Sequence, residues 1–135
     1  FFMLFFEGLE SYALLILRVF LGIIFIYHGI PKLRMPGALG KGLGFPSGFV
    51  LFLGLVEFIS GLALVLGFYT EIVALLVAIV MLGALYYKIF KWKVSFFAMD
   101  KTGWEFDFIL FAAAVAILLL GAGAFSLDAL LGIWP

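Results

Sequence analysis

The sequence contains no cysteine among its 135 residues, and it has little charge and only one histidine. The absence of cysteine excludes disulfides, thiol catalysis, cysteine-ligated zinc and cysteine-ligated iron–sulfur clusters. Charged residues make up 12% of the chain and balance to a formal net charge of zero, which gives no electrostatic basis for binding nucleic acid. One histidine also excludes a bis-histidine haem site within a single copy of the chain.

Apolar residues are present in great excess. They make up 67% of the chain, and the mean hydropathy is +1.35. Soluble domains are about 45–50% apolar and about 25% charged, and a domain of this size buries only about two-thirds of its surface. We therefore expect a single domain over residues 1–135 that is surrounded by lipid.

Four apolar segments are long enough to cross a bilayer, at about residues 12–30, 49–68, 72–90 and 106–125. A transmembrane helix needs about 20 such residues. The segments are continuous rather than alternating, which favours helices over strands. We predict an all-α, membrane-embedded bundle of four transmembrane helices.

The connections between these segments differ in composition. Residues 31–48 form a Gly/Pro-rich segment that predicts a loop, and residues 91–103 predict a polar and aromatic loop. The turn near residue 70 offers Thr70 as an N-cap for the third helix. After the fourth span, Ser126 predicts the N-cap of a short surface helix with Asp128 in its first turn.

The basic residues indicate how the bundle is oriented. Seven of the eight fall in two clusters at the first and third loops: Lys32, Arg34 and Lys41, then Lys88, Lys91, Lys93 and Lys101. On the opposite side, all the charged residues are acidic. The positive-inside rule places loops 31–48 and 91–103 in the cytoplasm and both termini outside, in the plasma membrane. Residues 1–10 are expected to be an interfacial lead-in.

Two charged residues lie inside the apolar segments. Arg18 lies about seven residues into the first span, and Glu57 lies near the middle of the second. A charge at the centre of a membrane helix costs about 2.5–3.5 kcal/mol on insertion scales. The two spans run in opposite directions, so we predict an Arg18–Glu57 ion pair. A purely structural pair and a ligand-binding or proton-handling pair both remain open.

A second polar group is expected near the cytoplasmic ends. His28 and Lys32 are four residues apart and share a helical face, while Glu105 and Asp107 begin the fourth helix at a similar depth. For Lys32 and Glu105 we favour interfacial snorkelling and simple solvation. Asp107 lies deeper. A haem shared between two copies, or His28 with carboxylates on a metal ion, stays open as a minor alternative, although no metal site is predicted.

Several short segments resemble the DoxX family of small membrane proteins. The resemblance begins near Leu14 and rests on these residues in their order: Leu17-Arg18-Val19, Tyr27 to Leu33, Glu57 to Gly67, Thr70-Glu71, Gly103 to Asp107, Gly121-Ala122-Gly123 and Ser126-Leu127-Asp128. It implies a four-helix membrane bundle. It also implies polar family positions at Arg18, His28, Lys32, Glu57 and Glu105, without a catalytic assignment.

The resemblance leaves three functions to weigh. Some relatives are subunits of a thiosulfate:quinone oxidoreductase, which implies a redox subunit that acts with a partner oxidoreductase and has a quinone as its candidate ligand. The candidate ligand groups are then His28 with Asp107, or Arg18 with Glu57. The alternative is a non-catalytic anchor whose basic loops bind a soluble enzyme. A small proton-coupled transporter is a weaker alternative, and both catalysis and homo-oligomerisation remain open.

Overall fold

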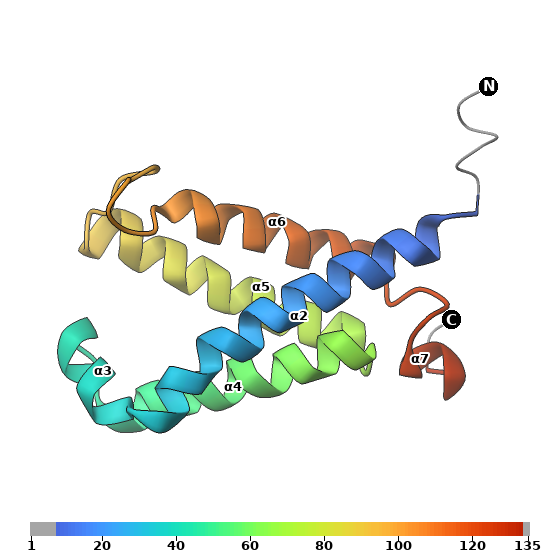
Figure 1. Ribbon diagram of the computed structural model, residues 1–135, viewed down its shortest axis with the longest axis horizontal. Coiled ribbons are helices and arrows are strands. Elements are labelled where there is room, and N and C mark those ends of the chain that lie inside the picture. Colours follow the sequence, from blue (N-terminus) through green and yellow to red (C-terminus); the bar gives the residue numbers. More distant parts are fainter. Residues whose placement is uncertain (1–7, 134–135) are drawn as a thin grey trace.

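The computed structural model describes residues 8–133, and every regular element in that range is helical (Figure 1). The elements are α2 (Glu10–Arg34), α3 (Pro36–Leu43), α4 (Ser47–Leu66), α5 (Thr70–Tyr86), the π-helical turn η1 (Tyr87–Lys91), α6 (Trp104–Leu120) and α7 (Leu127–Leu130). Most of the lead-in expected over residues 1–10 lies outside the described range.

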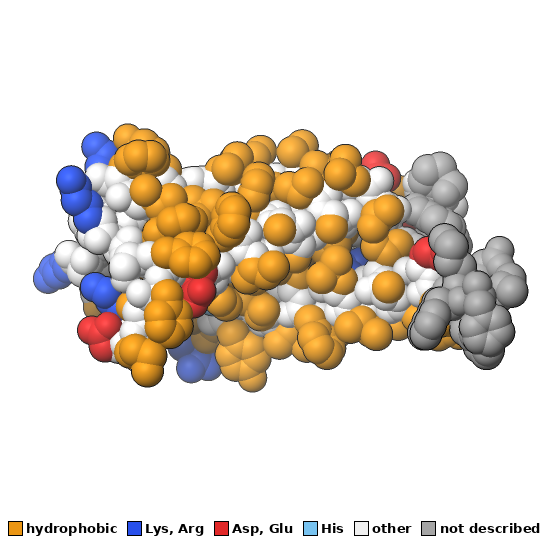
Figure 2. Space-filling view, turned by 90° about the horizontal axis from the view of Figure 1, so that it is seen from above, with side chains coloured by type: hydrophobic (Ala, Val, Ile, Leu, Met, Phe, Trp, Pro, Cys, Tyr) orange, Lys and Arg blue, Asp and Glu red, His pale blue; other side chains and the backbone are white. Residues whose placement is uncertain are grey.

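Among residues 8–133, three helices are long and apolar enough to cross a membrane: Glu10–Arg34, Ser47–Leu66 and Thr70–Lys91. They overlap the first three predicted spans. α6 overlaps the fourth predicted span but begins at Trp104 and has 17 residues, because Gly121 ends it with a positive φ of 83°. Large apolar side chains cover the flank of the molecule, and basic side chains gather at one end (Figure 2). This distribution is that of a multi-pass membrane protein.

The first helix pair, α2 and α4, packs through glycines. A Cβ atom built on Gly22 would lie 2.6 Å from the carbonyl oxygen of Gly61, and one built on Gly29 would lie 2.8 Å from that of Gly54. The backbones therefore touch, as small residues at membrane helix interfaces allow. These four glycines face the partner helix, and they set the register of the pair.

The second helix pair is α5 and α6, which share the main hydrophobic core with α2 and α4. Its most buried members are small or branched residues: Leu64, Ala74, Val77, Ala114 and Ile117. α4 and α5 meet at their connecting turn and diverge toward their other ends, so the two helix pairs separate at the end that carries the basic loops (Figure 1). This separation makes room for a site.

The prediction that residues 31–48 form a loop is wrong for most of that segment. α2 continues through Pro31 to Arg34, and residues 36–43 form α3. Gly40 is buried, and a Cβ atom built on it would lie 2.5 Å from the carbonyl oxygen of Phe45, which leaves no space for a side chain. Gly44, with φ of 81°, then ends the helix. The glycines therefore pack and end a helix.

The cap of α5 comes from a distant residue. Tyr69, not Thr70, occupies the N-cap position, and the carboxylate of Asp128 accepts hydrogen bonds from the N–H groups of Tyr69 (2.7 Å) and Thr70 (2.9 Å). Asp128 is 4% exposed, so α7 is not a free surface helix. The predicted N-cap of α7 is confirmed, because Ser126 Oγ accepts from the Ala129 N–H.

Candidate functional site

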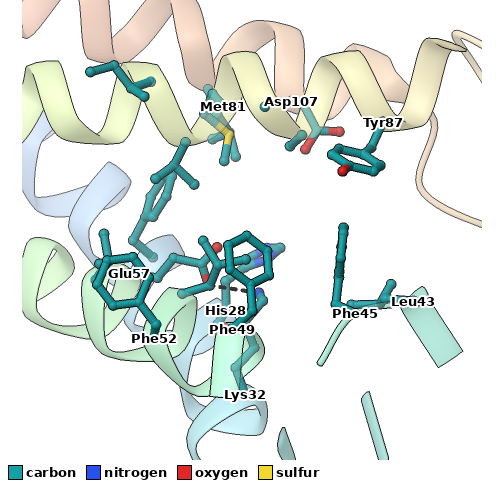
Figure 3. A pocket seen from close by; sticks show the side chains of 18 of the residues that line it. His28, Lys32, Leu43, Phe45, Phe49, Phe52, Glu57, Met81, Tyr87 and Asp107 are labelled. Atoms are coloured by element: carbon teal, nitrogen blue, oxygen red, sulfur yellow. Dashed lines mark hydrogen bonds and ion pairs between the residues drawn. The ribbon is translucent and has the colours of Figure 1, made fainter. Parts of the chain in front are cut away.

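A cavity of about 480 Å³ lies between the two helix pairs, near the basic loops (Figure 3). Its walls are mostly aliphatic and aromatic. The polar side chains that line it are His28, Lys32, Glu57, Lys88 and Asp107. A mostly apolar cavity with a few converging polar groups is the usual form of a small-molecule site.

Lys32 and Glu57 form an ion pair on the α2–α4 side of the cavity. Lys32 Nζ lies 2.7 Å from Glu57 Oε2 and donates a second hydrogen bond of 3.2 Å to the carbonyl oxygen of His28. Glu57 faces inward beside Gly54 and Gly61, and the long side chain of Lys32 reaches it from the last turns of α2. The favoured interpretation of Lys32 as a snorkelling interfacial residue is wrong.

Lys88 and Asp107 form a second ion pair on the α5–α6 side. The distance from Lys88 Nζ to Asp107 Oδ2 is 2.6 Å. Asp107 lies in the first turn of α6, and Lys88 lies in η1, the π-helical turn that continues α5. Single π-helical turns often occur at functional sites. Tyr87 and Lys88 both lie in this wider turn, and both line the cavity although they are adjacent in sequence.

The two ion pairs belong to different helix pairs and line the same cavity. Figure 3 shows Lys32 and Glu57 on one side of it and Asp107 on the other. Each pair is neutral overall, which lowers the cost of placing four charged groups within an apolar bundle. The ammonium groups are hydrogen-bond donors, and the carboxylates are acceptors or proton carriers. A ligand in the cavity would therefore meet a donor and an acceptor on each side.

His28 lies where the cavity approaches the molecular surface. Its ring stacks on Phe106, with 5.6 Å between ring centroids and 21° between planes. His28 is exposed, and its imidazole has no hydrogen-bond partner among residues 8–133. His28 and Lys32 also line a second hollow of about 360 Å³, together with Tyr27, Pro31 and Leu39.

Arg18 is far from this cavity, and the predicted Arg18–Glu57 ion pair is wrong. Arg18 is 1% exposed and donates to three backbone carbonyl oxygens: those of Leu64 (2.7 Å), Ala122 (2.6 Å) and Phe125 (2.7 Å). Because Gly22 lies against Gly61 and Gly29 against Gly54, Arg18 lies near the end of α4 and about two turns from Glu57. It fastens the segment after α6 to the first helix pair.

The remaining sequence candidate is Glu105. It is half-buried in the first turn of α6 but does not line the cavity, and no ion pair to it occurs among residues 8–133. No three His, Asp or Glu side chains in the same range come together in a way that would hold a metal ion. The candidate site therefore comprises His28, Lys32, Glu57, Lys88 and Asp107.

Sequence reasoning did not single out Lys88 or the aromatic residues at the end of the cavity. Phe45 lies between the helix pairs, with ring centroids 5.0 Å from Tyr87, 6.2 Å from Trp92 and 5.2 Å from Phe49. These four residues, the aromatic cluster, bridge the cavity on the side of the basic loops. No regular spacing in the sequence reveals this cluster. Phe45 follows Gly44, whose left-handed conformation ends α3, so Phe45 does not continue a helical pattern.

Comparison with known proteins places these features in a family. The DoxX family model matches residues 13–92. A protein of Bacillus subtilis (strain 168) named "Putative oxidoreductase CatD" is 32% identical over 117 residues, which cover 84% of this chain and 83% of that protein. No solved structure matches the chain.

Proposed function

Because the chain belongs to the DoxX family, we propose that it is the membrane subunit of a redox system and that its cavity binds a quinone for a partner oxidoreductase. The name of the Bacillus subtilis relative supports the redox association. The observation that carries the proposal is the apolar cavity with Lys32–Glu57 on one side and Lys88–Asp107 on the other.

The proposal includes a four-span arrangement. α6 has 17 residues, a length of about 26 Å, against a bilayer core of about 30 Å. We infer that it is the fourth span, because it runs alongside α5 in the bundle (Figure 1). The positive-inside rule then places the cavity in the cytoplasmic half of the plasma membrane, near the basic loops.

The chemistry of the cavity suits a quinone head. A quinone needs an apolar slot for its ring and hydrogen-bond donors at its two carbonyl oxygens. The ammonium groups of Lys32 and Lys88 are donors on opposite sides, and the unpartnered His28 ring is a third polar group. Reduction of a quinone to a quinol consumes two electrons and two protons. The partner oxidoreductase supplies the electrons, and the polar groups of the cavity carry the protons to the oxygens.

A binding titration tests the proposal. The protein in lipid nanodiscs is titrated with a decyl-benzoquinone, and binding is followed by quenching of tryptophan fluorescence, because Trp92 lines the cavity. We expect saturable quenching that is lost when Lys88→Met and Asp107→Leu are combined. Changing both partners leaves no unpaired buried charge, so the fold should survive.

The matched control is Glu71→Gln, an exposed carboxylate at the other end of α5. It should bind the quinone as the unaltered protein does. Absence of saturable quenching in the unaltered protein would sink the proposal. If the doubly substituted protein binds the quinone as tightly as the unaltered protein does, the Lys88–Asp107 ion pair is not part of the binding site.

The second candidate function is a non-catalytic anchor for a soluble enzyme. It is favoured by the exposed lysines of the basic loops, Lys41, Lys91, Lys93 and Lys101. Figure 2 shows basic side chains gathered at one end of the bundle. Such a surface suits an acidic protein or anionic headgroups. Lysine-directed cross-linking in cells should capture an oxidoreductase, and capture should fall when Lys91 and Lys93 are changed to Gln. Recovery of lipid alone would contradict the anchor function.

A further inference from the structure

The bundle leaves the cavity open between α4 and α5. Phe52 of α4 and Ile79 of α5 line it, and they are 59% and 55% exposed. By contrast, the inner wall residues Phe25 and Met81 are buried. α4 and α5 are joined by a tight turn and diverge from it, so the gap between them widens along the membrane-spanning part of the helices (Figure 1). The open side therefore faces the lipid.

Gly83 lies at the edge of this lateral opening. It lines the cavity, it is exposed, and a Cβ atom built on it would meet no other atom within 4 Å. It lies four residues after Ile79 on the same helical face. Its φ is not in the left-handed region, and glycine inside a helix costs about 1 kcal/mol relative to alanine. Neither packing nor backbone conformation requires a glycine at residue 83. An unobstructed opening does require one, because a larger side chain there would narrow it.

The other side of the cavity, toward the basic loops, is covered by the aromatic cluster of Phe45, Phe49, Tyr87 and Trp92. Phe45 and Trp92 meet across the two helix pairs there. Water-soluble molecules coming from the basic end would have to displace these contacts. Lipid-dissolved molecules would reach the lateral opening without displacing them.

We propose that the ligand enters the cavity sideways from the bilayer, between α4 and α5 and past Gly83. The ligand class is a lipid-dissolved molecule with a polar head and an apolar chain, whose head lies against the ion pairs and whose chain stays in the lateral opening. A cavity of about 480 Å³ has the size that encloses a drug-sized head. The route rests on the structure alone, and only the identity of the head rests on the proposed function.

Alkylation of a single introduced cysteine tests the route. The chain has no cysteine, so Met81→Cys places one thiol on the inner wall (Figure 3). In proteoliposomes, an N-alkyl maleimide dissolved in the bilayer should label it. Adding Gly83→Leu should slow labelling about tenfold, a barrier increase of about 1.4 kcal/mol. A buried thiol reacts slowly, but that effect is common to the compared variants.

The matched control is Gly48→Leu. Gly48 is an exposed helical glycine in α4 whose built Cβ also meets nothing within 4 Å, but it does not line the cavity. It should leave the labelling rate unchanged. Equal rates with and without Gly83→Leu would overturn the route, as would faster labelling by a membrane-impermeant sulfonated maleimide. Val56→Cys, on the opposite wall, repeats the test if Met81→Cys does not fold.

A second measurement separates the route from the identity of the head. Gly83→Leu should weaken binding of a decyl-benzoquinone about tenfold, or about 1.4 kcal/mol, and leave binding of the same quinone without its chain unchanged. If neither quinone binds but labelling still depends on residue 83, the quinone is wrong and the route stands. If the Gly83→Leu variant binds each quinone as tightly as the unaltered protein does, the proposed route is wrong and the proposed quinone ligand stands.

Discussion

Lys32 and Glu57 join α2 to α4 through an ion pair with 2.7 Å between Nζ and Oε2. This pair explains why an acidic residue lies within a long apolar helix. It also gives Glu57 a partner from the basic cluster at the first loop, while Arg18 binds backbone carbonyl oxygens at the other end of the bundle. The structure therefore neutralises Glu57 with Lys32, and it satisfies Arg18 with backbone carbonyl oxygens. A single Arg18–Glu57 pair would have done both.

The variant Glu57→Ala should destabilise the protein by about 3 kcal/mol, because it leaves the Lys32 ammonium without its partner. Adding Lys32→Met should restore much of the loss, whereas adding Arg18→Met should not. Thermal unfolding in detergent, followed by circular dichroism, compares the three proteins. Rescue through residue 18 instead of residue 32 would contradict the observed pairing.

The variant Arg18→Met should destabilise the bundle by about 3 kcal/mol, because three backbone carbonyl oxygens, two of them buried, lose charged donors. Arg18→Lys should rescue it only in part, since an ammonium group does not reproduce the planar fork of guanidinium donors. Protease sensitivity of residues 121–133 reports the detachment of this segment. Stability equal to that of the unaltered protein in Arg18→Lys would show that charge alone is sufficient.

The variant Gly61→Ala should weaken the α2–α4 contact, because its Cβ would lie 2.6 Å from the Gly22 carbonyl oxygen and 2.7 Å from the Ile26 nitrogen. Overpacking of this kind costs about 1–3 kcal/mol. Gly48→Ala, in the same helix but in open space, should be neutral or slightly stabilising. Thermal unfolding of the two variants tests the difference, and equal melting temperatures would contradict close packing at Gly61.

Single cysteines test the orientation of the bundle. Gly37→Cys lies in α3 on the basic side, and Ala124→Cys lies after α6 on the other side; both positions are exposed. With the basic loops in the cytoplasm, a membrane-impermeant maleimide should label Ala124→Cys in intact cells. It should label Gly37→Cys only after permeabilisation, and the reverse pattern would invert the topology.

The sequence was sufficient to predict the helical class, the family and the approximate ends of three spans. It also identified His28, Glu57 and Asp107, which the structure brings to one cavity; their role in binding stays a prediction. Hydropathy gives the helical class and the spans because it depends on residues close together in the chain, whereas the family came from the resemblance of several short segments.

Pairing across the bundle could not be predicted in the same way. The Arg18–Glu57 expectation compared only approximate depths within the two spans. The helices pack in a register that places Arg18 beside Leu64, about two turns from Glu57. The glycine contacts carried the correct register, because only one antiparallel alignment brings Gly22 to Gly61 and Gly29 to Gly54.

Other features depend on geometry that the sequence does not display. Lys88 is part of a basic cluster in the sequence, and only the π-helical turn carries it to Asp107. Asp128 caps a helix that begins 58 residues earlier. Neither a change of helical period over one turn nor a distant cap leaves a periodic signal.

The hydrogen bonds of Arg18 also constrain the order of assembly. During synthesis α2 emerges first and carries a buried guanidinium group, but two of its three acceptors belong to Ala122 and Phe125. Until those residues are made, the charge has most of its donors unpaired in an apolar setting, which is costly. The bundle can therefore reach its final packing only after the segment beyond α6 has been synthesised. A chain that stops before residue 121 would remain incompletely folded, and quality-control proteases could recognise it by that unpaired charge.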